Sequence, residues 1–309
     1  SKKIVSLFKI TRLMDQLKNH PLYRVHDLDS AMTSLWDFYR TRFLSLFIIS
    51  LVMSLITQYS VMLVNIKELQ GITDPEEMMA MLRSKMVPLL GLAVVSLLFS
   101  TILHYYILIR PVDEERNIVS VIAKSFVYFL PYLIIMILFA FAGAIVIVLG
   151  ILALIVGVFF AALYLGMISF FFLPVLMAEG PDIGRAIVRT LRLSHRNFWP
   201  NMGWSAVIIL IYLVLSMVLS GIIMIPFAGN FLKTMFNPAG ATEAMGTFFN
   251  PLFLGLSALA NALIMPLLPI FSFILYFNGR AREEGGTVAS SGGGSPGDRV
   301  KVEDLYAKD

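Results

Sequence analysis

The chain has no cysteine, which excludes disulfide bridges, thiolate metal sites and cysteine nucleophiles together. Histidine is also scarce, and no two of the four histidines have the i, i+4 spacing that is typical of metal ligands on a helix. The sequence shows no pattern in which a nucleophile, a base and an orienting group visibly converge. We therefore expect no catalytic residues, no bound metal and no cofactor.

Charged residues are few as well. Only 14% of the 309 residues are charged, 58% are hydrophobic, and the mean hydropathy is +0.81. A soluble domain is about 25% charged and about 45–50% apolar. One water-soluble core of this size cannot bury so much apolar surface, so lipid must be the solvent for much of the chain. The composition predicts an integral membrane protein and excludes an ordinary soluble enzyme.

Six apolar stretches are long enough to cross a bilayer, which takes about 20 residues in a helix. The third and fourth form one apolar block, which would be over about 75 Å long as a single helix at 1.5 Å per residue. We place a turn at Leu149-Gly150, with Gly143 and Gly157 as alternatives. The predicted fold is all-α and polytopic, with transmembrane helices at 43–64, 87–109, 126–149, 151–177, 204–226 and 252–277.

The distribution of basic residues predicts the orientation. Segments 1–42, 110–125, 178–203 and 278–309 hold 20 of the 24 Lys and Arg residues. By the positive-inside rule these segments are cytoplasmic, and so are both termini. We expect an amphipathic N-terminal segment (1–42) without a cleavable signal peptide, a transmembrane domain (43–277) and a flexible cytoplasmic tail (278–309). The net charge of +4 then reflects topology, and nucleic-acid binding is not expected.

Two of the cytoplasmic stretches resemble each other. Residues 28–43 align with residues 183–198 without a gap, at an offset of 155 that places Ala31 on Ala186. A fainter copy covers residues 117–126. Each copy predicts a short amphipathic helix, a bend near Asn or Pro, and a membrane hairpin, so that three such units would surround a pseudo-three-fold axis. The alternative is that any helix beside a membrane is amphipathic.

A family resemblance begins at the second of these stretches. The run Pro174-Val175-Leu176-Met177-Ala178-Glu179-Gly180-Pro181 ends a span, Ala186-Ile187-Val188-Arg189-Thr190-Leu191 follows, and Arg196-Asn197-Phe198-Trp199 enters the next span. This order resembles the bacterial six-span proteins related to the membrane domain of glycerophosphoryl diester phosphodiesterases. In span number and loop order the resemblance covers most of residues 28–280, and it departs at Thr190, where serine is more usual.

The resemblance implies a six-span fold in a bacterial cytoplasmic (inner) membrane. It does not imply phosphodiesterase activity, because that reaction needs a soluble barrel with clustered carboxylates and histidines. The longest polar stretches of this chain are too short for such a barrel.

One basic face is the clearest candidate binding site. Arg185, Arg189, Arg192 and Arg196 recur at intervals of three or four residues, which places them on one side of a helix. We expect this side to lie at the level of the cytoplasmic headgroups, where basic residues favour anionic lipids. The alternative ligand is a protein partner.

A transport pathway would need other residues. Between the span boundaries there is no Asp, Glu, Lys or Arg, which argues against an ion-coupled transporter or a proton channel. His104 is either a proton or ligand site or an interfacial histidine. Asn261, Pro266 and Pro269 are expected to break the last span, and discontinuous helices often line binding sites. Proline kinks are also ordinary in membrane helices.

The end of the chain changes in character. Residues 285–297 are rich in Gly and Ser, as in a flexible linker, and residues 298–309 follow. Val302, Leu305 and Tyr306 give this tip apolar anchors of the kind that dock a tethered peptide onto a protein partner. The alternative is a solvated end.

Two functions fit these observations. The first is a non-catalytic membrane scaffold or assembly protein, which binds a protein partner on the cytoplasmic side through its helices and tail. The second is a permease or lipid-handling protein for a neutral or amphiphilic substrate. A filled bundle would favour the scaffold, and a deep polar cavity in mid-membrane would favour transport.

Overall fold

The computed structural model describes residues 15–64, 74–113, 117–229, 246 and 249–291, and within these ranges it contains helices and no strand. The described helices are α2 (Leu28–Thr41), α3 (Phe43–Val64), α4 (Pro75–Ile109), α5 (Ile118–Leu152), α6 (Leu154–Glu179), α7 (Ile183–Arg196), α8 (Phe198–Met224), the short 3-10 helix η2 (Ile225–Phe227), α11 (Pro251–Ile264) and α12 (Leu267–Ser291).

Six helical stretches are long and apolar enough to cross a membrane, which confirms the prediction of a multi-pass, all-α membrane protein. Which membrane the protein occupies, and on which side its termini lie, stay predictions. The six stretches are Phe43–Ser60, Pro75–Ile109, Ile118–Leu152, Ile155–Glu179, Phe198–Phe227 and Pro251–Gly285.

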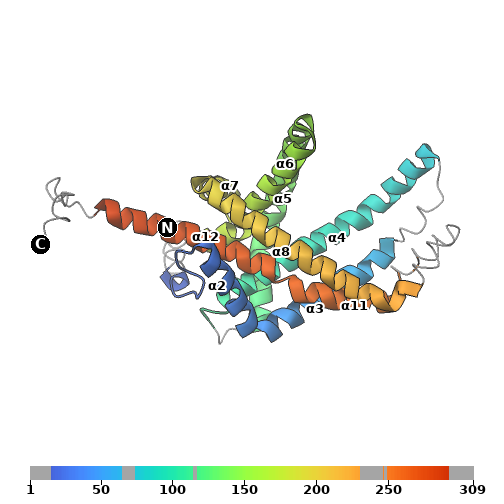
Figure 1. Cartoon of the computed structure of the whole chain (residues 1–309), viewed down its shortest axis with the longest axis horizontal. Coiled ribbons are helices and arrows are strands. Elements are labelled where there is room, and N and C mark those ends of the chain that lie inside the picture. Colours follow the sequence, from blue (N-terminus) through green and yellow to red (C-terminus); the bar gives the residue numbers. More distant parts are fainter. Residues whose placement is uncertain (1–14, 65–73, 114–116, 230–245, 247–248, 292–309) are drawn as a thin grey trace, which may run out of the picture.

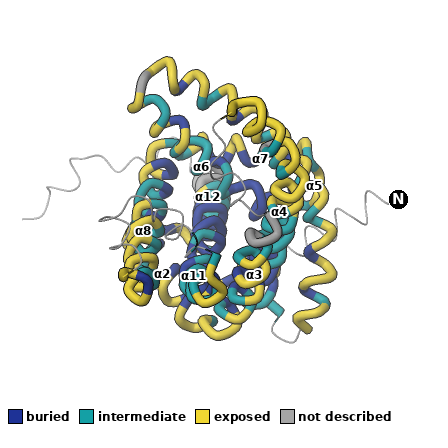
Figure 2. The backbone as a smooth tube through the Cα atoms, turned by 90° about the vertical axis from the view of Figure 1, so that its right-hand side faces the viewer, coloured by how far each residue is buried: buried dark blue, intermediate teal, exposed yellow. Residues whose placement is uncertain are grey.

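The helices are arranged around α12. In Figure 1, α4 and the α5–α6 pair extend in different directions from the region where α2, α7 and α12 meet. The most apolar part of Pro251–Gly285 is 67% buried, whereas that of Phe198–Phe227 is only 6% buried. Figure 2 shows the same contrast, with buried residues gathered along α12 and exposed ones on α8. The core therefore lies around α12, and the outer helices turn apolar side chains outward, as lipid requires.

The turn between α5 and α6 differs from the prediction. It lies at Ala153, not at Leu149-Gly150. Gly150 and Gly157 instead face each other across the hairpin, and a Cβ on Gly150 would lie only 2.8 Å from the carbonyl oxygen of Gly157. These glycines let the two helices approach closely, and they flank the turn without forming it.

α2 and α7 have closely similar local structure. Each has 14 residues and an aspartate N-cap, Asp27 or Asp182, and their bounds differ by 155 residues. One residue separates each from the long helix that follows. All four buried positions of α7 match buried positions of α2: Ala186 with Ala31, Thr190 with Leu35, Leu193 with Phe38, and Ser194 with Tyr39.

The third stretch behaves differently. Asn117 caps α5, but this helix continues without interruption from Ile118 to Leu152 and includes Pro131. The bend that we expected between a short helix and a span is therefore not present there. Neighbouring helices in the membrane can compensate for the hydrogen bond that a proline removes, so a long helix tolerates it.

The segment before α2 packs onto the bundle. Leu17 and Leu22 are buried, and the side chain of His20 contacts the end of α4 through the carbonyl oxygen of Ile107, at 3.1 Å. The amide of His26 donates to the Oδ1 atom of Asn278 on α12, at 3.0 Å. This segment is thus part of the folded structure and covers the ends of two spans.

Candidate functional site

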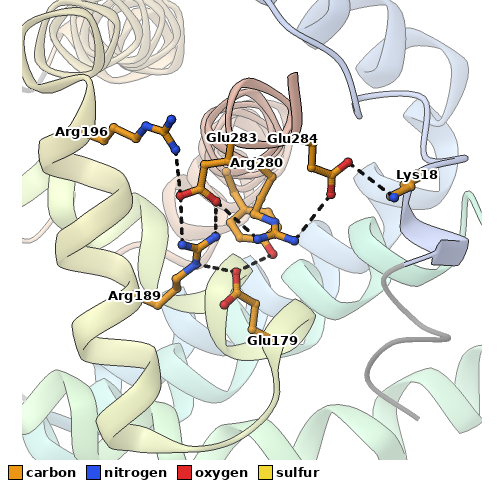
Figure 3. Close-up of polar contacts among 8 residues, drawn as sticks. Lys18, Glu179, Arg189, Arg196, Arg280, Glu283 and Glu284 are labelled. Carbon is orange, nitrogen blue, oxygen red and sulfur yellow. Dashed lines mark hydrogen bonds and ion pairs between the residues drawn. The ribbon is translucent and has the colours of Figure 1, made fainter. Parts of the chain in front are cut away.

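Charged side chains from α6, α7 and α12 meet at one end of the bundle (Figure 3). Arg189 of α7 lies at the centre, and only 15% of its side chain is exposed. Its Nε donates to Glu179 at 2.9 Å, and its two terminal nitrogens donate to the two carboxylate oxygens of Glu283. This bidentate geometry is the strongest arrangement of an arginine and a carboxylate. It ties α7 to both α6 and α12.

Further ion pairs extend this cluster, which we call the α12 network. Glu283 also pairs with Arg196 at 3.2 Å and with Arg280 at 3.4 Å. Glu284 pairs with Arg280 at 3.7 Å and with Lys18 at 3.6 Å. The network therefore joins the segment before α2, the end of α6, α7 and α12. Tyr276 also belongs to the network, because its hydroxyl donates to Glu179 at 3.2 Å. The members are Lys18, Glu179, Arg189, Arg196, Tyr276, Arg280, Glu283 and Glu284 (Figure 3).

Local structure explains why Arg189 points inward. α6 ends at Glu179 because Gly180 has φ 106°, a backbone conformation that favours glycine. The Asp182 side chain then accepts the Arg185 amide at 2.9 Å and starts α7. Ala186 and Leu193 of α7 are buried. Arg189 lies between them in sequence on the same side, which brings its guanidinium to Glu179.

The electrostatics of the network follow from these contacts. Burial lowers the pKa of Arg189, but hydrogen bonds and charges from Glu283 and Glu179 outweigh it and hold this pKa above its usual range. Arg189 therefore stays charged at any ordinary pH. The Arg185 amide and side chain lower the pKa of Asp182, which keeps this N-cap ionised.

A hollow of about 370 Å³ lies beside the network, between α6 and α7. Arg185, Arg189 and Arg192 line it together with Glu179. Val175, Gly180, Gly184, Ala186 and Val188 form the rest of its wall. The lining of the hollow thus combines basic and apolar side chains.

The four predicted arginines fall into two groups. Arg189 and Arg196 are ion-paired with Glu283, so their charges are used within the protein. Arg185 and Arg192 line the hollow without joining the network. Arg185 forms an exposed pair with Asp182, and Arg192 forms no ion pair within the part of the chain that the structure describes. Binding of a lipid or a partner here stays a prediction.

Sequence reasoning missed the acidic side of the network. Arg280, Glu283 and Glu284 have i, i+3 and i, i+4 spacing, which places them as neighbours on one helix. That spacing was a visible signal. We instead expected a flexible tail from residue 278 and a linker from residue 285, whereas α12 continues as a helix to Ser291.

The residues proposed for a pathway have separate partners. His104 is buried on α4, its Nδ1 lies 2.7 Å from the carbonyl oxygen of Ser100, and its ring lies 5.9 Å from that of Phe273. Within the described ranges no hydrogen bond or ring contact joins His104 to Asn261, Pro266 or Pro269.

The last span is interrupted, as Pro266 and Pro269 predicted. α11 ends at Ile264 and α12 begins at Leu267. The interruption leaves the carbonyl of Leu263 without its usual helical donor, and the Tyr39 hydroxyl of α2 donates to it at 2.7 Å. Asn261 still accepts the amide of Met265 through its carbonyl, at 2.8 Å. Tyr39 thus supplies a donor from within the protein to one of the carbonyls at the break.

Val302, Leu305 and Tyr306 lie outside the described residues, so the docking tip stays a prediction. Among the residues that the structure does describe, no group of three or more His, Asp or Glu side chains is placed to hold a metal ion.

The comparisons with known proteins found no matching family model, no matching curated protein and no matching solved structure. Within its described residues the chain is a multi-pass, all-α membrane protein, with six helical stretches long and apolar enough to cross a bilayer and an ion-paired network at one end (Figure 3). Its resemblance to the six-span proteins related to the phosphodiesterase membrane domain stays a prediction.

Proposed function

We propose that the protein is a non-catalytic membrane scaffold that binds a protein partner at its network end, through α2, α7 and the tail that follows α12. The observation that carries this proposal is the filled centre of the bundle. Phe271, Phe273, Tyr276 and Phe277 of α12 are completely buried. Close packing of this kind resists deformation, which suits a protein that holds another in place better than one that opens a path.

The α12 network supports the same proposal. Removing one partner of a buried ion pair is strongly destabilising, so the network fixes α7 firmly relative to α12. α12 then continues as a helix to Ser291. α12 is thus held to α7 at Glu283 and extends past it before the tail begins (Figure 1). A partner held by the tail would lie at the network end, near the exposed sides of α2 and α7.

An internal repeat is part of this proposal. The shared length, cap and buried positions of α2 and α7 support two equivalent amphipathic connectors, with the start of α5 as a divergent third. Such a chain would present two similar helices to its partner. We place both termini in the cytoplasm, because the segments that hold most of the basic residues lie on that side of the membrane. The resemblance to the bacterial six-span proteins favours a bacterial cytoplasmic membrane.

Affinity purification from native membranes tests the scaffold. The tagged chain is compared with a variant in which residues 298–309 are replaced by a Gly-Ser sequence of equal length, so that the tail keeps its reach. We expect one protein to be enriched with the natural chain and lost with the variant. If both chains recover the same proteins in the same amounts, the tail binds no partner and the scaffold proposal is wrong.

A permease or lipid-handling protein is the second candidate. The interrupted last span favours it, as do the diverging apolar helices α4, α5–α6 and α8 (Figure 1). The bond from Tyr39 occupies the Leu263 carbonyl, which leaves one acceptor fewer for a ligand at the interruption. Proteoliposomes that show protein-dependent movement of a solute or a labelled lipid would favour this candidate.

A further inference from the structure

The hollow between α6 and α7 contains basic groups that the fold does not need. Arg189 is held by Glu179 and Glu283, and it forms the fixed back of the hollow. The side chain of Arg185 is 69% exposed, and among the described residues it pairs only with Asp182, at 3.3 Å. Exposed pairs of this kind contribute little stability, so a ligand can compete for the guanidinium. Arg192 forms no ion pair with any described residue, which leaves a second guanidinium available.

The chemistry of these groups favours a phosphate. A guanidinium presents paired N–H donors that match two phosphate oxygens, and arginine is favoured where phosphates are bound. Glu179 would repel an anion, but its Oε1 accepts from both Arg189 and Tyr276. The volume of about 370 Å³ falls in the lower part of the range of about 300–1,000 Å³ typical of small-molecule sites.

The surroundings of the hollow favour a ligand that also has an apolar part. Val175 and Val188 line the hollow next to the arginines. On the same stretch of chain Val188 is 59% exposed, Leu191 is 40% exposed and Trp199 is 71% exposed. Tryptophan with basic neighbours is typical of the interface between water and lipid. A basic hollow whose lining includes the exposed Val188, with further exposed apolar side chains on the same stretch of chain, is complementary to a phospholipid.

We propose that this hollow binds the phosphate of an anionic phospholipid headgroup through Arg185 and Arg192, with Arg189 as the fixed base of the site. The acyl chains lie along the apolar side of α7. This site is separate from the tail, so the proposal neither requires the scaffold function nor fails with it. It narrows the predicted basic face from four arginines to the two that the network leaves available.

Lipid retention tests the proposal. The full chain is reconstituted into nanodiscs of phosphatidylcholine with phosphatidylglycerol, released into mild detergent, and its retained lipids are counted by native mass spectrometry. The test variant is Arg185→Gln with Arg192→Gln. The matched control, Arg40→Gln with Lys124→Gln, removes two exposed positive charges outside the hollow. The test variant loses two charged hydrogen-bond donors to the phosphate, so it should retain phosphatidylglycerol at least about tenfold less than the natural chain.

Three results would overturn the proposal. Equal losses in the test and control variants would indicate diffuse attraction and no site. Equal retention of phosphatidylcholine and phosphatidylglycerol by the natural chain would exclude an anionic headgroup. Displacement of the retained lipid by millimolar glycerol phosphate, with no effect of the acyl chains, would show a site for soluble phosphates. Thermal unfolding of each variant in the same detergent checks that a loss of lipid is not a loss of fold.

Discussion

Arg189 of α7 and Glu283 of α12 lie 94 residues apart in the chain and form a bidentate ion pair at the end of the bundle (Figure 3). Only 15% and 16% of their side chains are exposed. The pair joins the connector helix between two spans to the central helix, and the rest of the α12 network is arranged around it.

Replacing Arg189 by Gln should therefore destabilise the protein, because Glu179 and Glu283 would keep their charges in a partly buried place. We expect a loss of about 3 kcal/mol in the free energy of unfolding, the usual cost of removing one partner of a buried ion pair. Thermal unfolding in detergent, followed by size-exclusion chromatography, measures it. Arg185→Gln is the matched control and should change little, since its pair is exposed. Equal stability of the two variants would contradict a structural role for the network.

Stability should also depend on pH through His20. Burial is the main reason that the pKa of His20 falls from 6.5 to about 4, with a smaller effect from the charge of Arg42. The unfolded chain binds this proton first, so stability is highest above pH 6.5 and falls as the pH decreases toward 4. The loss from this group should reach about 3 kcal/mol.

The neutral form of His20 has a definite role. Its Nδ1 accepts the Leu22 amide at 3.2 Å, so the proton lies on Nε2 and is donated to the Ile107 carbonyl. His20→Gln keeps a donor for Ile107 and cannot titrate. Its unfolding temperature should vary less between pH 7 and pH 5 than that of the natural chain. The same pH dependence in both chains would show that other groups are responsible, His26 among them, whose pKa burial also lowers.

The α5–α6 hairpin gives a further prediction. Gly150→Ala would bring a methyl group within 2.8 Å of the Gly157 carbonyl oxygen, so the helices must move apart. We expect a loss of about 1–3 kcal/mol from overpacking. Gly221→Ala on α8 is the control, because nothing lies within 4 Å of its added Cβ. Alanine also favours a helix over glycine, so this control should be neutral or slightly stabilising. If Gly150→Ala is as stable as this control, or more stable, the close approach is contradicted.

The predictability of the fold depends on the range of the interactions. Apolar length alone predicts six spans, because each crossing is a local property of about 20 residues. The predicted turn lies a few residues from the observed one at Ala153, because glycine is common both in turns and where helices pack closely. Gly150 and Gly157 occur here for close packing of the two helices. The capped helices α2 and α7 were predictable, since Asp27 and Asp182 act within one turn.

The candidate site was predictable only in part. The interval of the arginines predicts a helix face, but it cannot predict that Arg189 meets Glu283 from another span. That pairing depends on how the helices cross, which no local pattern encodes. Pro266 predicted the interruption of the last span. It could not predict that the hydroxyl of Tyr39 donates to the freed carbonyl of Leu263, because these residues are 224 positions apart in the chain.

Topology can be tested directly because the chain has no native cysteine. Cysteines placed singly at Ser84, near the start of α4, and at Ser291, at the end of α12, should react from opposite sides of the membrane with an impermeant thiol reagent. In intact cells we expect Ser84→Cys to label and Ser291→Cys to label only after the membrane is opened. Labelling of both from one side would contradict the six-span arrangement.

The central claim is that this protein holds a partner without opening its packed centre. A Cβ on Gly279 of α12 would lie 3.4 Å from the side chain of Leu193 on α7, so cysteines at these two positions can be joined by a short, reducible crosslinker. The measurement is the amount of partner recovered by the crosslinked chain, with each single-cysteine variant capped by a monofunctional reagent as control. The scaffold account predicts full recovery with the crosslink in place. Loss of the partner in the crosslinked chain alone, restored by reduction, would show that α7 and α12 must move apart and would contradict it.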